Sequence, residues 1–545
     1  MKAFFLLILC QLLSVVAAAQ PDDWTFACAF GAPTEVADVA TDEDGNYYIT
    51  GRFSGSLQLG NTRLTSAGPS LYIAKYRPGG QLLRVTQLSA TTDVQPRGIA
   101  VDDDGNCYVT GSFRGTLRAV CSPWAPIALT AAGTSDVFVL RCGPLGIVRW
   151  IRQATGSSLG SGSICYGEGV ALDAAGNCYL TGQVSGIEVL FGSVRVANTT
   201  LNSAFLASYS AQGALRWARI WRNTGLSSIS RGGGIALASG NTGYLSGIFN
   251  GVWTLDNVTM SAMPGGLFLA QFDSRQGRLA WSISPAALTS GSGRAVATDR
   301  RGRVYLGGGF FGSFGSSGPA SQGSSDAFVA RYTAQGTLEQ VVPLGGGGAD
   351  AINDIATEPN SGKVFATGSI TSAQAPREQA FLARIQPNGR VQALEKVTGP
   401  GSGIGLCLAI DERENIYTTG AFTGNCRFGS FVLNGGASQQ GYFARYGRAF
   451  CPVPPAPADA PTLALDVFPN PANHQLTLHL PAGQAGVRAT LYDARGQVVA
   501  EHTAAPGQAP ADLQFGTATL PEGQYTLRIA QEQQQVRTRQ ISIRH

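Results

Sequence analysis

The feature that most constrains this 545-residue chain is a pattern of roughly 60 residues that recurs seven times. Each copy opens with a short apolar run ending in Ala, and the second copy reads Gly98-Ile99-Ala100-Val101-Asp102. The recurrent alanines are Ala40, Ala100, Ala171, Ala236, Ala297, Ala356 and Ala409. A small side chain at one fixed position favours strands that crowd around a common axis, where a larger side chain would collide with its neighbours.

Three further strands follow in each copy. The second carries an aromatic residue with Gly three positions later, as in Tyr108 and Gly111, and we expect it to end there in a tight bend. The third alternates as in Phe328–Tyr332, and the fourth carries Trp in several copies, for example Trp150. Four strands per copy predict an all-β protein built as a β-propeller, with the extra length between the second and third strands.

The two ends of the repeat region complete each other. The seventh copy stops after its third strand at Tyr446, whereas Asp23–Cys28 forms an orphan fourth strand whose Trp24 matches Trp150. A solenoid, the competing repeat architecture, would instead need atypical capping repeats. We therefore expect a seven-bladed propeller over residues 20–447, closed by the N-terminal strand so that the ring has no open sheet edge.

The repeated Gly-Asn-x-Tyr-x-Thr-Gly and Phe-x-Ala-Arg-Tyr motifs resemble the bacterial seven-bladed propeller repeat family known as SBBP. The resemblance covers residues 23–447 and recurs in order along the chain. It implies the fold but no single activity, because propellers carry many functions on one frame.

Residues 1–19 are typical of a secretory signal peptide. Lys2 is followed by an apolar run and by Ala17-Ala18-Ala19, which predicts cleavage between Ala19 and Gln20. A lipoprotein signal at Cys10 is disfavoured by the bulky Leu9, and the run is shorter than the ~20 residues that a membrane helix needs. We expect no membrane span in the mature chain.

The C-terminal part has a different composition. A Pro-rich linker, residues 448–462, precedes alternating strands such as Gln475–Leu480, and strands in hairpins predict a small β-sandwich over residues 463–545. Its Val467–Pro471 start and its Gly523-Gln524-Tyr525 strand resemble the type A sorting domain of the type IX secretion system of Bacteroidota. The resemblance implies recognition by that machinery and a secreted or surface-attached product; the alternative is an ordinary sandwich that is retained.

The composition of the chain limits which partners, metals and catalytic groups we expect. The net charge of +4 comes without a basic block in the repeats, which argues against nucleic acid as a partner. Nine cysteines remain after signal cleavage, without a zinc spacing, and an odd count leaves a thiol unpaired. All four histidines lie in the C-terminal module, which excludes histidine-dependent catalysis in the ring. We therefore expect no cofactor and no metal, and a monomeric chain.

Three sets of residues could still carry chemistry or bind a ligand. The acidic turns Asp42–Asn46 and Asp102–Asn106 suggest calcium, but the equivalent turns Asp173–Asn177 and Asp299–Arg303 lack the second carboxylate, so a hairpin turn explains them better. Carboxylates that we expect at the solvent-facing surface or the channel rim are Glu168, Asp350, Asp354 and Glu358. Trp124, Trp221 and Trp253 fall outside the fourth-strand position; we expect burial, with exposed stacking on sugars as the alternative.

Two functions follow as expectations. The first, which we favour, is a non-catalytic secreted or surface propeller that binds an extracellular glycan or protein through its long loops, such as Arg114–Thr134. The second is an exported polysaccharide hydrolase or lyase that uses rim carboxylates. Both assume export through the periplasm to the outer cell surface.

Overall fold

A computed structural model describes residues 23–447 and 466–544, apart from 32–33, 120–126, 158–161, 199–201, 286–287, 359, 373–374, 469–471, 473, 481–486, 494–496, 505–510 and 532–534. The chain divides into two compact units, Met1–Phe450 and Cys451–His545. The expected signal peptide, its cleavage between Ala19 and Gln20, and the linker 448–462 lie outside the described residues.

Strands are the only regular elements of the described residues, so the all-β prediction is confirmed. In the first unit each repeat forms a four-stranded antiparallel sheet, given in the order first to fourth strand. The sheets are β2 (Thr34–Thr41), β3 (Tyr47–Leu59), β4 (Thr62–Tyr76), β5 (Leu82–Ala90); β6 (Asp93–Val101), β7 (Cys107–Arg114), β10 (Asp136–Cys142), β11 (Val148–Ser157); β12 (Tyr166–Leu172), β13 (Cys178–Val184), β16 (Ser203–Tyr209), β17 (Leu215–Ile220); β18 (Arg222–Leu237), β19 (Thr242–Leu255), β20 (Val258–Asp273), β21 (Leu279–Ile283); β22 (Leu288–Thr298), β23 (Val304–Gly312), β24 (Asp326–Tyr332), β25 (Leu338–Leu344); β26 (Ala351–Thr357), β27 (Val364–Ser372), β28 (Ala375–Ile385), β29 (Val391–Lys396); and β30 (Ser402–Ile410), β31 (Ile416–Thr423), β34 (Gln440–Gly447), β1 (Asp23–Ala29).

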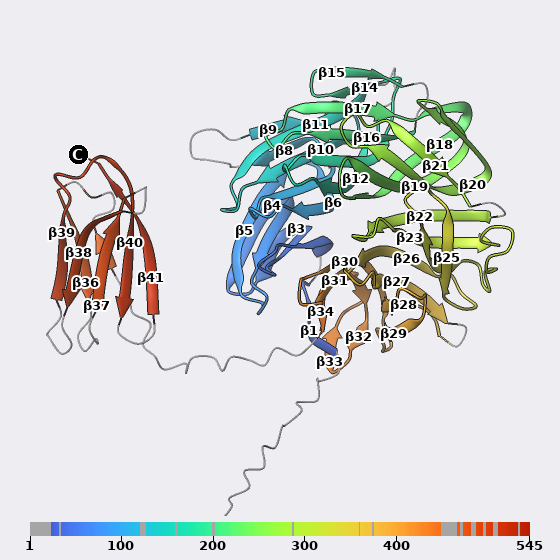
Figure 1. Cartoon of the computed structure of the whole chain (residues 1–545). Coiled ribbons are helices and arrows are strands. Elements are labelled where there is room, and N and C mark those ends of the chain that lie inside the picture. Colours follow the sequence, from blue (N-terminus) through green and yellow to red (C-terminus); the bar gives the residue numbers. More distant parts are fainter. Residues whose placement is uncertain are drawn as a thin grey trace, which may run out of the picture. The chain divides into compact units, whose positions relative to one another are not determined.

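The first strands of these sheets pack against one another in sequence. β2 contacts β6, and the series continues through β12, β18, β22, β26 and β30, which in turn contacts β2. Figure 1 shows the sheets arranged around a common centre, with later strands of each sheet lying farther out. The recurrent alanines, such as Ala297, lie on these inner strands.

The N-terminal strand lies in the same sheet as the last repeat. β1 pairs antiparallel with β34, and Trp24 is the register partner of Tyr446. Trp24 is buried and its ring meets those of Phe428 and Tyr446 edge-on, with centroids 5.1 and 5.4 Å away. Segments more than 400 residues apart therefore share one hydrophobic cluster.

The connections between second and third strands add hairpins that attach to the preceding sheet. β8 (Thr116–Ala119) and β9 (Ile127–Thr130) extend the first sheet through β5, and β14 (Glu188–Phe191) and β15 (Val194–Ala197) extend the second through β11. A further hairpin is formed by β32 (Asn425–Phe428) and β33 (Phe431–Asn434). Part of the length that the sequence places in loops, including β8 and β9 of the Arg114–Thr134 segment, therefore forms strands that extend a neighbouring sheet.

The glycine that recurs three positions after the aromatic residue of each second strand does not end that strand. The prediction of a tight bend there was wrong. β3, β7 and the equivalent strands continue past this glycine. A Cβ on Gly51, Gly111, Gly182, Gly247, Gly308, Gly368 or Gly420 would lie closer than 3.0 Å to a carbonyl oxygen of the paired first strand. Each first strand has its register shift next to this point, so the glycine makes room for a β-bulge.

The second unit is a small two-sheet structure. One sheet contains β35 (Asp466–Phe468), β36 (Gln475–Leu480) and β39 (Ala511–Gly516); the other contains β38 (Val498–Ala504), β37 (Val487–Tyr492), β40 (Gly523–Gln531) and β41 (Gln535–Ile543). Leu478 and Phe515 of the first sheet share a buried cluster with Leu491 and Leu527 of the second. This two-layer packing is the sandwich that the alternating strands predict.

Candidate functional site

A cavity of about 690 Å³ lies between the first strands of the first unit. Its lining comes from every first strand, from β2 through β30, with additions from second strands such as Arg52 of β3 and Ile248 of β19. First and second strands are antiparallel, and Thr34 at the start of β2 pairs with Phe53 in the middle of β3, so one mouth of the cavity lies toward the loops between second and third strands. A volume of this size is typical of small-ligand sites.

The β-bulges determine which side chains enter the cavity. Each first strand has a register shift in the same place, β18 and β22 have a second shift elsewhere, and the bulged positions all line the cavity. In sheet order these residues are Ala37, Arg97, Glu168, Gly233 with Gly234, Arg294, Asn353 and Leu406. A bulge re-aims one side chain without disturbing the rest of the strand. The bulge position is therefore the place where the otherwise similar sheets present different chemistry.

Four arginines, Arg52, Arg97, Arg231 and Arg294, line the cavity. Arg52 lies 2.6 Å from Glu35 and 3.0 Å from Asp93, and Arg231 is paired with Glu168. Among the described residues, neither Arg97 nor Arg294 has a carboxylate within ion-pair distance. Burial and the neighbouring positive charge of Arg231 lower the pKa of Arg294.

Two carboxyl groups and a thiol meet deeper in the cavity, at the position after the bulge. The ligand atoms of Asp38, Asp354 and Cys407 all lie within 4.8 Å of one another. Burial raises the pKa of Asp38 to about 6, and burial with the charge of Asp38 raises the pKa of Asp354 to about 8. Both carboxyl groups therefore bind a proton more readily than an exposed carboxyl group does.

These carboxyls also hold neighbouring sheets together. Asp38 accepts hydrogen bonds from the N–H groups of Val39 and of Ile99 in the next sheet, both at 2.7 Å. Asp354 bridges in the same way to Leu408 at 2.8 Å. The arrangement can share a proton or accept hydrogen bonds from a polar ligand, and its backbone contacts fix the carboxyl positions.

The carboxylates expected at the rim separate into two groups. Glu168 and Asp354 line the cavity. Asp350 is buried elsewhere, where it accepts hydrogen bonds from Gly346 and Thr371 at 2.7 Å. Glu358 accepts hydrogen bonds from the backbone N–H groups of Asn360 and Ser361 in the turn between the first and second strands.

Sequence reasoning did not single out Asp38. A signal was present in the residue before each Val/Ile/Leu-Ala pair. This residue is Gly or Ala in four copies, and it is Asp38, Asp354 and Cys407 in the others.

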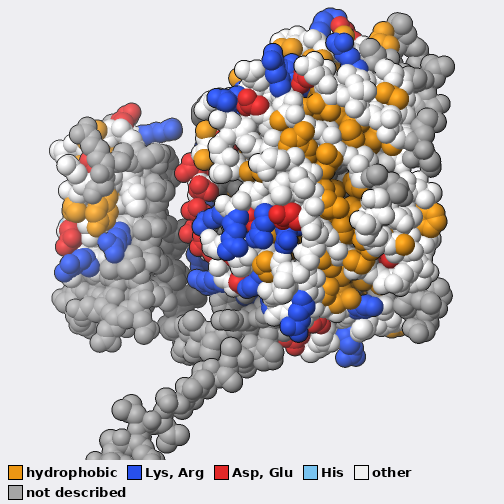
Figure 2. All heavy atoms as spheres, turned by 45° about the vertical axis from the view of Figure 1, so that its right-hand side comes forward, with side chains coloured by type: hydrophobic (Ala, Val, Ile, Leu, Met, Phe, Trp, Pro, Cys, Tyr) orange, Lys and Arg blue, Asp and Glu red, His pale blue; other side chains and the backbone are white. Residues whose placement is uncertain are grey.

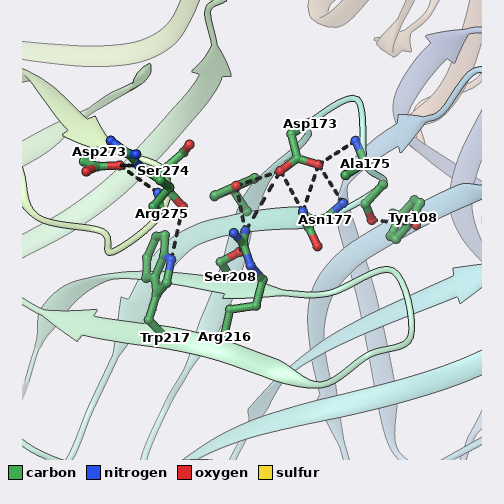
Figure 3. A network of polar contacts seen from close by, with 12 residues as sticks. Tyr108, Asp173, Ala175, Asn177, Ser208, Arg216, Trp217, Asp273, Ser274 and Arg275 are labelled. Carbon is green, nitrogen blue, oxygen red and sulfur yellow. Dashed lines mark hydrogen bonds and ion pairs between the residues drawn. The ribbon is translucent and has the colours of Figure 1, made fainter. Parts of the chain in front are cut away.

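The acidic turns are hairpin turns with contacts to the neighbouring sheet. Figure 3 shows Asp173 accepting from Asn177, while the hydroxyl of Tyr108 donates to the carbonyl of Gly176 at 2.9 Å. In the first repeat, Lys75 lies 3.1 Å from Asp42 and supplies the positive charge that a cation would bring. The second carboxylates of these turns, such as Asp44, point to solvent. These contacts favour the turn interpretation over calcium.

The tryptophans pack within and between sheets. Trp150, Trp217 and Trp281 each donate the indole N–H to a carbonyl in the turn of the following sheet. Trp221 and Trp253, the candidates for exposed stacking, are buried against each other with ring centroids 5.9 Å apart. Trp124 and Cys121 lie outside the described residues.

Six described cysteines are free thiols: Cys28, Cys107, Cys165, Cys178, Cys407 and Cys426.

Two family models match parts of the chain. Residues 466–544 match the secretion system C-terminal sorting domain, and residues 84–112, which include β6 and most of β7, match a beta-propeller repeat. The chain thus carries both elements that its motifs indicate, and the sorting domain implies secretion or export to the cell surface. Among the described residues, no helix could cross a membrane.

More distant likenesses are weak. Over 181 residues, 30% of this chain, the sequence is 26% identical to the uncharacterized WD repeat-containing protein L264 of Acanthamoeba polyphaga mimivirus, and the match spans 13% of that protein. Quinohemoprotein alcohol dehydrogenase from Comamonas testosteroni aligns over 78% of this chain and 76% of its own, at 10% identity and a TM-score of 0.39. PorZ, a surface component of the type IX secretion system of Porphyromonas gingivalis, aligns over 95% and 100% at 9% identity and a TM-score of 0.18. Likeness at this level assigns no activity to the chain.

Proposed function

We propose that the mature chain is a secreted or surface-attached seven-bladed propeller, closed by β1, that binds an extracellular glycan or protein without transforming it. The signal peptide 1–19 would direct Sec export, with cleavage between Ala19 and Gln20, and residues 463–545 would engage the type IX machinery. The ring, residues 20–447, would act as a monomer. Closure is supported by the pairing of β1 with β34 and by the contact of β30 with β2.

The observation that carries the binding role is the contrast between the residues that hold the sheets together and the residues that line the cavity. The sheets repeat the same Trp, Tyr and Gly contacts, whereas their bulge residues differ in charge and size. Variation confined to a cavity lining is typical of a binding site on a constant scaffold. On the face that Figure 2 shows, basic side chains lie beside acidic ones and next to a band of hydrophobic side chains. Such a mixture suits a glycan or protein better than a phosphate backbone.

The test is a glycan and protein array probed with the purified mature chain. Saturable binding to at least one class of extracellular ligand, with the ligand recovered unchanged, is the expected result. Incubation of the bound ligands with the protein, followed by mass analysis of products, supplies the decisive measurement. Turnover that disappears on substituting a cavity carboxylate would replace the binding role with catalysis.

A polysaccharide hydrolase or lyase is the second candidate. The closeness of Asp38 and Asp354, whose pKa values are raised to about 6 and about 8, is the observation that favours it. Two carboxyls in different protonation states are the usual requirement for acid–base work on a glycosidic bond. Their backbone hydrogen bonds to Ile99 and Leu408 favour instead a structural role, which is why binding remains the first proposal.

A further inference from the structure

The guanidinium of Arg294 is held in position inside the cavity by the neighbouring sheet. It donates to the Oδ1 atom of Asn353, whose Nδ2 atom donates to the carbonyl of Gly405 at 2.7 Å. Arg294, Asn353 and Gly405 thus form a chain across three successive first strands, β22, β26 and β30. Asn353 takes only part of the five N–H donors of a guanidinium, so the group keeps donors that face the cavity.

Arg97 approaches the same cavity from the other side. Its strand, β6, stands three sheets before β22 in the order of packed first strands. Its only hydrogen bond to a side chain among the described residues is a 3.4 Å contact with Gln95. Both arginines occupy bulge positions and are exposed, and neither has a carboxylate within ion-pair distance among the described residues, although the charge of Glu378 acts on Arg294. A positive charge that no ion pair neutralises favours the entry of an anion.

The remaining lining limits the charge of that anion. Glu35 and Glu168 are paired with Arg52 and Arg231, and Asp93 also pairs with Arg52, while Asp38 and Asp354 lie beside Cys407. Four arginines and four carboxyl groups line the cavity, so the charges of the lining nearly balance. A densely charged polyanion would be repelled by these carboxyl groups, whereas each carboxylate of a weakly charged ligand is matched by one guanidinium.

Hydroxyl groups on the ligand would find partners beside the arginines. Gln95, Asn353 and the Asp38–Asp354 pair supply hydrogen-bond donors and acceptors along the cavity. Carboxylate and hydroxyls on one small ring are the chemistry of a sugar acid, and the cavity of about 690 Å³ has room for a short saccharide.

We propose that the cavity binds a uronate-bearing saccharide, with its carboxylate on Arg294, its hydroxyls on the polar lining, and Arg97 available to a second uronate. The inference deepens the proposed binding role and rests on it. It assigns the bulge residues as the specificity-determining positions of the propeller.

The test is calorimetry of the mature full-length chain with digalacturonate, with the neutral galactose disaccharide and with sodium acetate. The expected result is binding of digalacturonate that is at least about tenfold tighter than either control, because a charge-assisted bidentate contact contributes about 1.5–3 kcal/mol and each 1.4 kcal/mol is tenfold. The affinity should fall as NaCl is raised. A panel of diglucuronate and dimannuronate covers the other common uronates.

Arg294→Gln should weaken digalacturonate binding about tenfold or more, and Arg97→Gln should weaken it less. Arg275→Gln is the matched control, since Arg275 is exposed and pairs only with Asp273 on a turn outside the cavity. Melting temperatures of all three variants check that each is folded.

Three outcomes would overturn the inference: equal affinity for the neutral disaccharide, affinity no greater than that of acetate, or binding unchanged in both Arg294→Gln and Arg97→Gln. The absence of binding across the whole uronate panel would overturn it as well. If array ligands still bind the Arg294→Gln protein normally, the cavity inference fails while the proposed binding role stands. If no array ligand binds the wild-type chain, both fail.

Discussion

Trp150 donates its indole N–H to the carbonyl oxygen of Ala211, 61 residues later in the chain, at 2.9 Å. The ring of Trp150 also covers Gly213, which has a φ of +80°, so a side chain at that turn position would meet the indole as well as strain the backbone. Trp217 and Trp281 repeat the contact with Ser274 and Ala334. In each of these three sheets, one tryptophan thus joins its sheet to the next through both packing and a hydrogen bond.

Trp150→Ala should lower the free energy of unfolding by about 3–5 kcal/mol, because it removes a buried ring from the contact between two sheets. Trp150→Phe keeps most of the packing and loses the hydrogen bond, so a loss of about 1–2 kcal/mol is expected. Urea unfolding followed by fluorescence and circular dichroism measures both. Equal losses in the two variants would contradict the importance of the ring.

Trp24→Ala tests closure of the ring. We expect a loss of about 3–5 kcal/mol, together with earlier proteolytic cleavage in the sheet of β30, β31 and β34. Phe26→Ala on the same strand is the control: Phe26 is 41% exposed, so its loss should stay near or below about 1 kcal/mol. If Trp24→Ala is no more harmful than Phe26→Ala, β1 does not hold the ring.

Gly111→Ala should destabilise the protein by about 3 kcal/mol or more, because the added Cβ would collide with the backbone of Gln95 and Pro96 at the bulge. Gly79→Ala is the matched control, since a Cβ there meets nothing within 4 Å. Its effect should stay within about 0.5 kcal/mol. Thermal melting compares the two, and similar melting temperatures would show that the bulge can move aside.

Asp354→Asn should alter how stability depends on pH. Its carboxyl has a pKa of about 8 in the folded protein against an ordinary value of 3.8, so folding takes up a proton between these values and stability falls as the pH rises. The asparagine does not ionise, and its side-chain oxygen can still accept from Leu408. The melting temperature of the variant relative to wild type should therefore rise from pH 4 to pH 8.5. Parallel curves would show that Asp354 ionises normally.

Calcium should leave the melting temperature of the full-length chain almost unchanged. Asp42 is already engaged by Asn46, Tyr48 and Lys75, so a cation would have to displace an ammonium group. Differential scanning calorimetry with and without about 5 mM CaCl₂, an excess of about 10³-fold over the protein, makes the comparison. The method reports binding because a ligand that binds only the folded state raises the stability of that state. Lys75→Met removes the ammonium group from Asp42, so in this variant a cation would have no ammonium group to displace. A large upward shift in the wild type would restore the calcium interpretation.

Much of the frame can be predicted from the residues. Starts of the fourth strands at Val148, Leu215 and Leu279 agree with the structure, as do third strands such as Phe328–Tyr332. These predictions succeed because alternation and turn residues are local properties of each repeat. The match of Trp24 to Trp150 goes further, since a repeated position carries information about a long-range contact.

The candidate site was largely missed for the opposite reason. Asp38, Asp354 and Cys407 come from the first and the last two repeats, and only the packing of the first strands against one another brings their side chains within 4.8 Å. The glycine of the second strand was assigned to a bend because its partner, the bulge carbonyl, lies on another strand.

The sequence by itself indicated the repeat, its strand order and the sorting domain, because each depends on short-range patterns along the chain. The tertiary structure decided which side chains face the central cavity and which of its carboxyl groups have raised pKa values. That choice depends on β-bulges and on contacts between sheets, where burial and neighbouring charges set the chemistry of residues that are ordinary in isolation.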